Sequence, residues 1–399
     1  MFHSLNSTAS SLLDDYSATK TKEYIVEIIF LAVISFFGVL GNGLGFAFYT
    51  LRSMRNTTTF LLKTLTLNDC LASLVNAFLI YDSTNSFRYP SDILCKIHGF
   101  LLHFFTANSM LLLIPLAMDR FACVVIVLSK WKFGITAARV VVVFYFVFSV
   151  LIGLPQLLVS SGVEHVVVAL PGNITITGHG CMFNFKNGNL SQNVFHIVDI
   201  VVICINLLIL SVLYGGIAIT LKRLSHGFKT DGNPTGRLKN SPVKLFKDLT
   251  QCENDSEAVS QQPSQEDSGN PTSPTATTAT TATRHEQQTE INSRGRLMRQ
   301  QRHRDIQLKI TLMMFVITVA SIISYGGYFY VRIFHNQYDN TLSPELKVLL
   351  RTICVNSTLN PYVLGFFSTD FRQFIYEILS FKWLRAKCFR KSTGISQSA

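Results

Sequence analysis

Residues 349–371 read LLRTICVNSTLNPYVLGFFSTDF, an apolar segment of helical length that also contains an arginine, two asparagines and a proline. If this segment crosses a membrane, the lipid offers no hydrogen-bond partners to its polar side chains. Ionisable and amide groups inside a spanning helix are therefore costly, and they usually face the protein interior and serve a function. The rest of the chain is therefore needed to interpret the roles of Arg351, Asn356 and Asn360.

The composition indicates a polytopic membrane protein. The 399 residues are 48% hydrophobic and only 15% charged, and the mean hydropathy is +0.31, which is unusual for a soluble protein of this size. Apolar runs of about 20 residues, the length needed to cross the hydrocarbon, recur along the chain. They predict an all-α bundle of seven spans, at 24–50, 58–82, 93–124, 139–160, 193–221, 306–334 and 344–367.

The charge pattern predicts the topology. Although the formal net charge is +11, the basic residues gather in the connections on one side of the spans, so no nucleic-acid partner is expected. By the positive-inside rule that side is cytoplasmic and the N-terminus is extracellular, as in a multi-pass plasma-membrane protein. The first residues, MFHSLNSTASSLLDD, lack a basic region followed by a short apolar core, so no cleavable signal peptide is expected.

The spans divide the chain into five parts. We expect 1–23 to be an extracellular N-terminus, 24–221 to hold spans one to five, 222–305 to be a disordered cytoplasmic loop, 306–367 to hold spans six and seven, and 368–399 to be an amphipathic helix and tail. The loop is rich in Ser, Thr, Gln and Pro, so it is either open to phosphorylation or only a solvated tether. Cys388 in the tail is either palmitoylated or free.

Extracellular modifications are predicted at five residues. Glycosylation sequons occur at Asn6, Asn173 and Asn189. Of the eight cysteines, Cys95 and Cys181 are the two that fall on the oxidising side, where we expect them to form a disulfide rather than remain free thiols.

Other polar residues lie within or at the ends of the spans. Asp69 in span two is costly in a membrane unless it is hydrated, paired or protonated, so it should face the bundle interior. It serves either a functional cluster or only a structural hydrogen bond to Asn42 of span one. Asp119 and Arg120 end span three, where an adjacent acid and base can also be a mere snorkelling pair.

Taken in order, these motifs resemble the rhodopsin-like (class A) G-protein-coupled receptors. The matching features are Gly41-Asn42, Leu65-x-x-x-Asp69, the spacing from Cys95 to Arg120, and Asn360-Pro361 followed by an amphipathic helix. The resemblance implies coupling to a heterotrimeric G protein through Asp119, Arg120 and Tyr214, with arrestin and receptor kinases as further partners. It also implies a polar cluster that holds a sodium ion at Asp69, together with Ser109, Asn356, Ser357 and Asn360. No other cofactor is expected.

The chain departs from the class A pattern at three of its usual landmarks. Asn206 stands where span five usually has proline, and Ser324-Tyr325-Gly326-Gly327 stands where span six usually has Cys-Trp-x-Pro. Leu364 stands where the tyrosine of Asn-Pro-x-x-Tyr is expected. These positions belong to the switch mechanism of the class, which must therefore differ here.

Span seven narrows the resemblance to the prostanoid receptors, in particular the prostaglandin E branch. The pattern Leu-Arg-x-x-x-x-Asn-x-x-Leu-(Asp/Asn)-Pro-aromatic-Val is matched at Leu350 to Val363, with Asn360 where that family usually has Asp, and Val331 to Gln337 ends span six as in that branch. This resemblance implies an acidic lipid like prostaglandin E2, signalling through Gs and cAMP. It implies ligand contacts from Arg351 as counter-ion to the carboxylate, and from Ser73, Tyr81, His179 and Cys354.

Alternatives to a ligand-binding Arg351 remain open. The first alternative is an internal pair of the arginine with Asp199 of span five or Glu345 near the start of span seven. A transporter of organic anions would use the same buried arginine, and a receptor of this architecture for a peptide or another acid is a further alternative. The sequence shows no enzyme signature, and His103 in span three is more typical of a packed histidine than of a catalyst.

Overall fold

The computed structural model describes residues 2–52, 56–125, 133–170, 174–183, 190–230, 309–331, 333–334 and 342–380. Within these residues, six helices are long and apolar enough to cross a membrane. They are α2 (Ile25–Leu51), α3 (Thr57–Thr84), α4 (Asp92–Val124), α5 (Ile135–Pro155, continued by a π-helical turn Gln156–Ser160), α6 (Leu190–Thr230) and the helix Lys309–Val331. A further helix, α1 (Phe2–Glu23), precedes them, and its backbone includes the sequon residue Asn6.

The chain divides into two compact units. The larger unit comprises Met1–Asp119, Phe133–Tyr214 and Met313–Ala399, and the smaller comprises Arg120–Lys132 and Gly215–Leu312. In the smaller unit α6 continues as helix to Thr230, past Lys222, where the sequence suggested that the loop begins. The rest of the expected loop, the sequons at Asn173 and Asn189, and Cys388 lie outside the described residues.

The seventh span is broken, and this corrects the expectation of one continuous helix. It consists of α9 (Pro344–Leu350), a 3₁₀ turn (Arg351–Cys354) and α10 (Val355–Phe367). The hydroxyl of Thr352 lies 2.7 Å from the carbonyl oxygen of Leu349 and 3.0 Å from that of Ser324. A threonine hydroxyl that bonds to a nearby backbone carbonyl competes with the helical ladder, which is consistent with the tighter turn at this place.

A β-hairpin that the sequence analysis did not predict links α5 to α6. Strand β1 (Ser161–Leu170) pairs antiparallel with β2 (Ile174–Phe183), with Val163 opposite Cys181. The Cys95–Cys181 disulfide is present and ties the hairpin to the start of α4, as expected. The signal for the hairpin is the pair of runs rich in β-branched residues, VEHVVVAL and ITIT, with the sequence Pro-Gly-Asn between them, which is typical of connections between strands.

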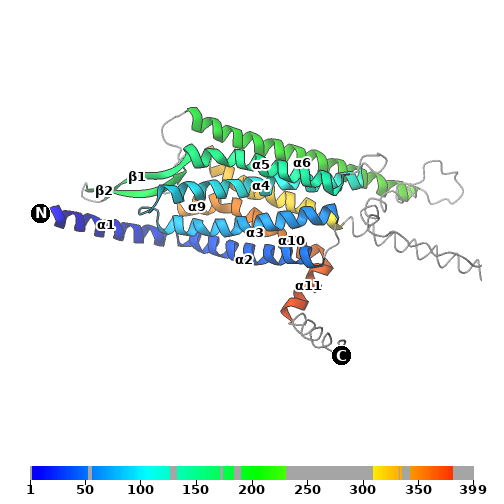
Figure 1. Cartoon of the computed structure of the whole chain (residues 1–399), viewed down its shortest axis with the longest axis horizontal. Coiled ribbons are helices and arrows are strands. Elements are labelled where there is room, and N and C mark those ends of the chain that lie inside the picture. The colour runs from blue at the N-terminus through cyan, green and yellow to red at the C-terminus, as the bar shows by residue number, and fades with distance from the viewer. Residues whose placement is uncertain are drawn as a thin grey trace, which may run out of the picture. The chain divides into compact units, whose positions relative to one another are not determined.

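Helices α2, α3 and α10 pack closely because α2 presents glycines to its neighbours. Figure 1 shows α2 and α3 side by side along their length. A Cβ atom at Gly38 would lie 2.3 Å from Ser73 Oγ and 3.0 Å from Thr358 Oγ1, and one at Gly41 would lie 2.7 Å from Pro361. The absence of a side chain at these two positions therefore permits the contact of the first span with the second and the seventh.

We expect Gly38→Val to destabilise the folded protein by about 1–3 kcal/mol, because the added carbons have no room in the helix interface. The matched control is Gly43→Val, since a Cβ at Gly43 meets nothing within 4 Å. Thermal unfolding of the two variants in lipid nanodiscs measures the difference. Equal melting temperatures would contradict the close packing of α2 against α3.

The amphipathic helix expected after the last span is α11 (Thr369–Leu379). The Ser368 hydroxyl caps it by accepting the backbone N–H of Phe371 at 3.1 Å. The rings of Phe371 and Phe374 are buried and pack on Phe48 of α2, with ring centroids 5.3 and 5.5 Å away. The apolar face of α11 is thus partly covered by the first span.

Candidate ligand-binding site

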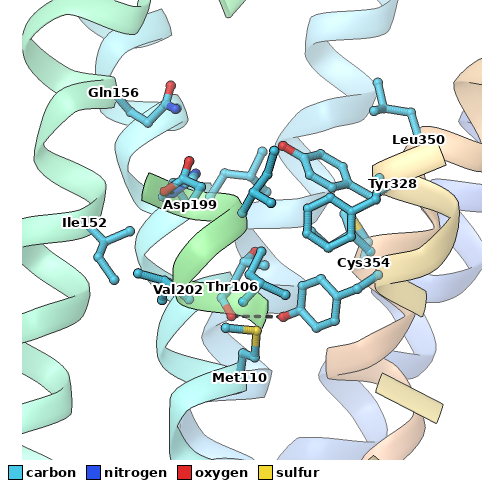
Figure 2. Close-up of a pocket in the computed structure, with 18 of the residues that line it drawn as sticks. Thr106, Met110, Ile152, Gln156, Asp199, Val202, Tyr328, Leu350 and Cys354 are labelled. Carbon is cyan, nitrogen blue, oxygen red and sulfur yellow. Dashed lines mark hydrogen bonds and ion pairs between the residues drawn. The ribbon is translucent and has the colours of Figure 1, made fainter. Parts of the chain in front are cut away.

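A cavity of about 480 Å³ lies within the larger unit. It is lined by residues of α4, the end of α5 with its π-helical turn, α6, the helix Lys309–Val331 and the broken seventh span. Most lining side chains are apolar, and the charged or titratable exceptions include His103, Asp199 and Arg351. Figure 2 shows Asp199 and Gln156 on one side of this cavity and Tyr328, Leu350 and Cys354 on the opposite side.

Arg351 reaches the cavity from the 3₁₀ turn and belongs to a buried cluster of charges. Its Nε donates a hydrogen bond to Glu27 Oε1 of α2 at 2.8 Å, and Lys347 Nζ of α9 lies 3.7 Å from Glu27 Oε2. Lys347 also lies over the ring of Tyr24, 3.4 Å from its centroid. Glu27 is fully buried, and Lys347 and Arg351 are only 1% and 7% exposed. These three side chains, which we call the charge cluster, hold two positive charges and one negative charge.

The charge cluster differs from the two internal pairs of Arg351, with Asp199 or with Glu345, that were considered from the sequence. The described acid that pairs with Arg351 is Glu27, whereas Asp199 pairs with His103 and Glu345 is exposed in the first turn of α9. The sequence analysis missed Glu27, although one signal was available. It is an acid close to the start of an otherwise apolar span, where a carboxylate needs a partner.

On the opposite wall, His103 of α4 and Asp199 of α6 form a pair. His103 Nε2 lies 3.2 Å from Asp199 Oδ1, and the two side chains are 24% and 21% exposed. Both residues line the cavity, so this pair differs from an ordinary packed histidine, which was the expectation for His103.

The other predicted ligand contacts divide into two groups. Cys354 lines the cavity beside Arg351. Ser73, Tyr81 and His179 are not among the lining residues that the structure describes. Ser73 is fully buried and donates to the carbonyl of Asp69, Tyr81 packs edge-to-face on Tyr89, and His179 lies on β2 against His165.

Below the cavity a chain of hydrogen bonds joins several of the residues predicted for the polar cluster. Asp69 is fully buried and accepts hydrogen bonds from Ser109 Oγ at 2.6 Å and from Asn360 Nδ2. Asn356 donates to Ser109 Oγ at 3.3 Å and accepts from Ser321 of the helix Lys309–Val331. Three helices therefore meet through side chains at Asp69, and the hydrogen bond of Ser321 to Asn356 joins a fourth to them.

The fifth predicted member, Ser357, is buried next in sequence to Asn356, and its backbone carbonyl accepts from Asn42 Nδ2 at 2.7 Å. The second hydrogen bond of Asn42 Nδ2 goes to the carbonyl of Gly38. Asn42 thus joins the first span to the backbone of the seventh. The sequence had suggested a different hydrogen bond, between Asn42 and Asp69.

The residues predicted for G-protein coupling lie toward the other end of the spans. Asp119 accepts a hydrogen bond from Thr58 Oγ1 at 2.7 Å. Arg120 is buried, and Tyr214 of α6 is buried with its ring 5.9 Å from that of Phe315. The three residues predicted from the sequence for G-protein coupling are therefore all buried in the structure.

These features describe a class of protein: in the part of the chain that the structure describes, a bundle of six long apolar helices and a broken seventh segment, with a cavity among them and a polar cluster below it. The family model for the 7 transmembrane receptor (rhodopsin family) matches residues 44–364. The chain belongs to that family and is therefore a G-protein-coupled receptor, neither an enzyme nor the transporter considered above. Its fold class is as predicted.

Among solved structures, the chain is similar to the crystal structure of squid rhodopsin, with a TM-score of 0.58 and 14% sequence identity. The similarity covers 96% of this chain and 93% of that one, and it shows a shared fold. No curated protein sequence matched the chain.

Proposed function

We propose that the protein is a plasma-membrane receptor for an extracellular acidic lipid of the prostaglandin E2 type, and that it signals through Gs and cAMP. The observation that carries this proposal is Arg351, a buried guanidinium in the wall of a mostly apolar cavity. A volume of about 480 Å³ is within the usual range for small-molecule sites, about 300–1,000 Å³. The apolar lining suits a hydrocarbon chain, and a guanidinium suits a carboxylate.

The charge cluster favours an anion at this place. The three side chains together carry a formal charge of +1. Positive charge in a low-dielectric site strongly attracts a negative group, because little water screens it. A ligand carboxylate beside Arg351 would bring the formal charge of the group to zero, with Glu27 still holding Nε.

The contacts below Arg351 supply a route for the signal. The Thr352 hydroxyl contacts the carbonyl of Ser324 at 3.0 Å, and Asn356 bonds to Ser321, so the seventh span is joined to the helix Lys309–Val331 at two levels. A ligand shifts the receptor toward its active conformation only if it binds that conformation more tightly. We infer that the acid does so by changing the contacts that the 3₁₀ turn and the helix after it make with Ser324 and Ser321.

A cell-based screen tests the proposal. Prostaglandin E2, arachidonic acid and their methyl esters are applied to cells that express the receptor and to matched cells without it, with cAMP and calcium as readouts. We expect a receptor-dependent cAMP rise with at least one free acid, and a response to its ester that is about 30- to 150-fold less potent, because the ester cannot form a charge-assisted pair. Equal potency of acid and ester, or activation by peptides alone, would contradict it.

The polar cluster fits a sodium ion. Asp69 supplies a carboxylate and Ser109 a hydroxyl oxygen, and Asn356 and Asn360, whose amide nitrogens face Ser109 and Asp69 here, would complete the oxygen donor set that a hard cation prefers by turning their amide oxygens to the ion. We expect sodium chloride to raise the melting temperature of the receptor relative to choline chloride by a few degrees, about 1–2 kcal/mol at ten times the dissociation constant.

Asp69→Asn removes the formal charge and should abolish the sodium dependence. Asp370→Asn, which removes an exposed acid from α11, should retain it. If both variants respond to sodium like the wild type, Asp69 does not hold the ion.

A further inference from the structure

The cavity lining holds a second charged group, Asp199, across from Leu350 and Cys354 (Figure 2). Arg351 and Cys354 enter from the seventh span, while Asp199 enters from α6 and His103 from α4. Figure 2 shows Asp199 across the cavity from Cys354 and Leu350, the neighbours of the arginine in the chain. The lining therefore combines a cation, Arg351 on the seventh span, with an acidic end, as we call the part at Asp199 and His103, among mostly apolar side chains.

The chemistry of the His103–Asp199 pair leaves it able to accept a further hydrogen bond. A carboxylate accepts at about four lone-pair positions, and a neutral histidine that donates from Nε2 fills one of them. Among the described residues, His103 is the side chain that pairs with Asp199, and it lies against Oδ1. With a neutral histidine the partly buried pair carries one negative charge at the edge of the cavity, so a ligand group that displaces its water is favoured there if it donates a hydrogen bond.

A purely hydrocarbon ligand tail does not fit this end. Contact with an apolar group would strip water from Asp199 without replacing its hydrogen bonds, at a cost of about 1–3 kcal/mol. The acidic end of the cavity therefore disfavours a ligand whose end remote from the carboxylate is apolar. It favours a ligand whose remote end can donate a hydrogen bond.

We propose that the ligand carries a hydrogen-bond donor, a hydroxyl or a protonated amine, at the end remote from its carboxylate, and that Asp199 accepts it while His103 positions Asp199. This inference rests on the proposed function for the carboxylate end alone. The ligand class is thus an amphiphilic acid with a carboxylate at one end of an apolar body and a hydrogen-bond donor at the other, rather than a simple fatty acid.

Three matched probes separate the two ends: dodecanoic acid, ω-hydroxydodecanoic acid and ω-aminododecanoic acid. Their apparent affinities are measured by thermal-shift titration of the full-length receptor in nanodiscs. We expect at least one of the two substituted acids to bind about tenfold more tightly than dodecanoic acid, in keeping with about 1.4 kcal/mol for the added hydrogen bond.

Variants then assign the effect to residues. Asp199→Ala should bring the substituted acids to parity with dodecanoic acid. Asp199→Asn should keep an advantage due to a hydroxyl, because the amide oxygen still accepts, and lose one due to an ammonium, because the negative charge is gone. Asp370→Asn, which removes an exposed acid elsewhere, should change neither ratio.

The outcomes distinguish the two proposals. Arg351→Gln should weaken the binding of all three probes alike and leave the ratios of their affinities unchanged. If this variant binds the probes as tightly as the wild type, Arg351 does not bind the carboxylate, and the proposal for Asp199 is unaffected. Equal binding of the three probes by the wild type, or the same ratios in Asp199→Ala, overturns the donor site even if the arginine result holds.

Discussion

Arg351→Gln is expected to reduce the potency of an activating acid by about 30- to 150-fold. The reason is that a hydrogen bond to a charged partner contributes about 2–3 kcal/mol in a buried site, and glutamine keeps the polarity but not the charge. The loss should appear in the concentration needed for a half-maximal cAMP response, with surface expression measured in parallel.

The substitution also leaves Glu27 buried beside one cation fewer, so a fall in response needs a control for folding. The double variant Glu27→Gln with Arg351→Gln removes the 2.8 Å ion pair and keeps Lys347, so the formal charge of the charge cluster stays at +1 as in the wild type. It should reach the surface and still fail to respond to the acid. Lys20→Gln, which removes an exposed cation on α1, should respond like the wild type. A double variant that responds normally would exclude Arg351 from ligand binding.

Glu27→Gln should have the largest effect on stability, with a loss of about 3–5 kcal/mol. This carboxylate is fully buried between two cations, and removing one partner of a buried ion pair leaves uncompensated charge in the interior. The expected result is a lower melting temperature of the ligand-free receptor. An acidic ligand should recover part of the loss, because its carboxylate replaces one negative charge beside Arg351.

The matched control is Glu23→Gln. Glu23 pairs with Lys20 on the surface of α1, and exposed pairs contribute about 0–1 kcal/mol. A wild-type melting temperature in Glu27→Gln, or a loss no larger than in Glu23→Gln, would mean that the charge cluster does not hold the first span to the seventh.

The spans were predictable because membrane thickness imposes length and composition on each of them separately. The expected second span, 58–82, corresponds to α3 at Thr57–Thr84, and the third, 93–124, to α4 at Asp92–Val124. Hydropathy carries no information on local geometry within a span. The 3₁₀ turn at Arg351–Cys354 and the π-helical turn at Gln156–Ser160 were therefore not foreseen.

The candidate site was predicted in part for a related reason. Arg351 and Asp69 are conspicuous because each is a charge inside an apolar segment, whatever its partner. Pairing is a property of the folded bundle: Glu27 meets Arg351 across 324 residues of sequence, and His103 meets Asp199 across 96. The predicted ligand contacts at Ser73 and Tyr81 rested on resemblance alone, and the packing of α3 turns them toward other partners.

The central claim is that Arg351 binds the carboxylate of the ligand, and one comparison tests it most directly. For an activating acid and its methyl ester, the ratio of potencies is measured in the wild type and in the Glu27→Gln, Arg351→Gln double variant, whose site has lost the guanidinium and its buried partner together. We predict a potency ratio of acid to ester of about 30 to 150 in the wild type and near one in the variant. The reason is that the ester and the acid differ only in the group that the arginine binds. An equally large ratio in both receptors would show that another residue reads the carboxylate.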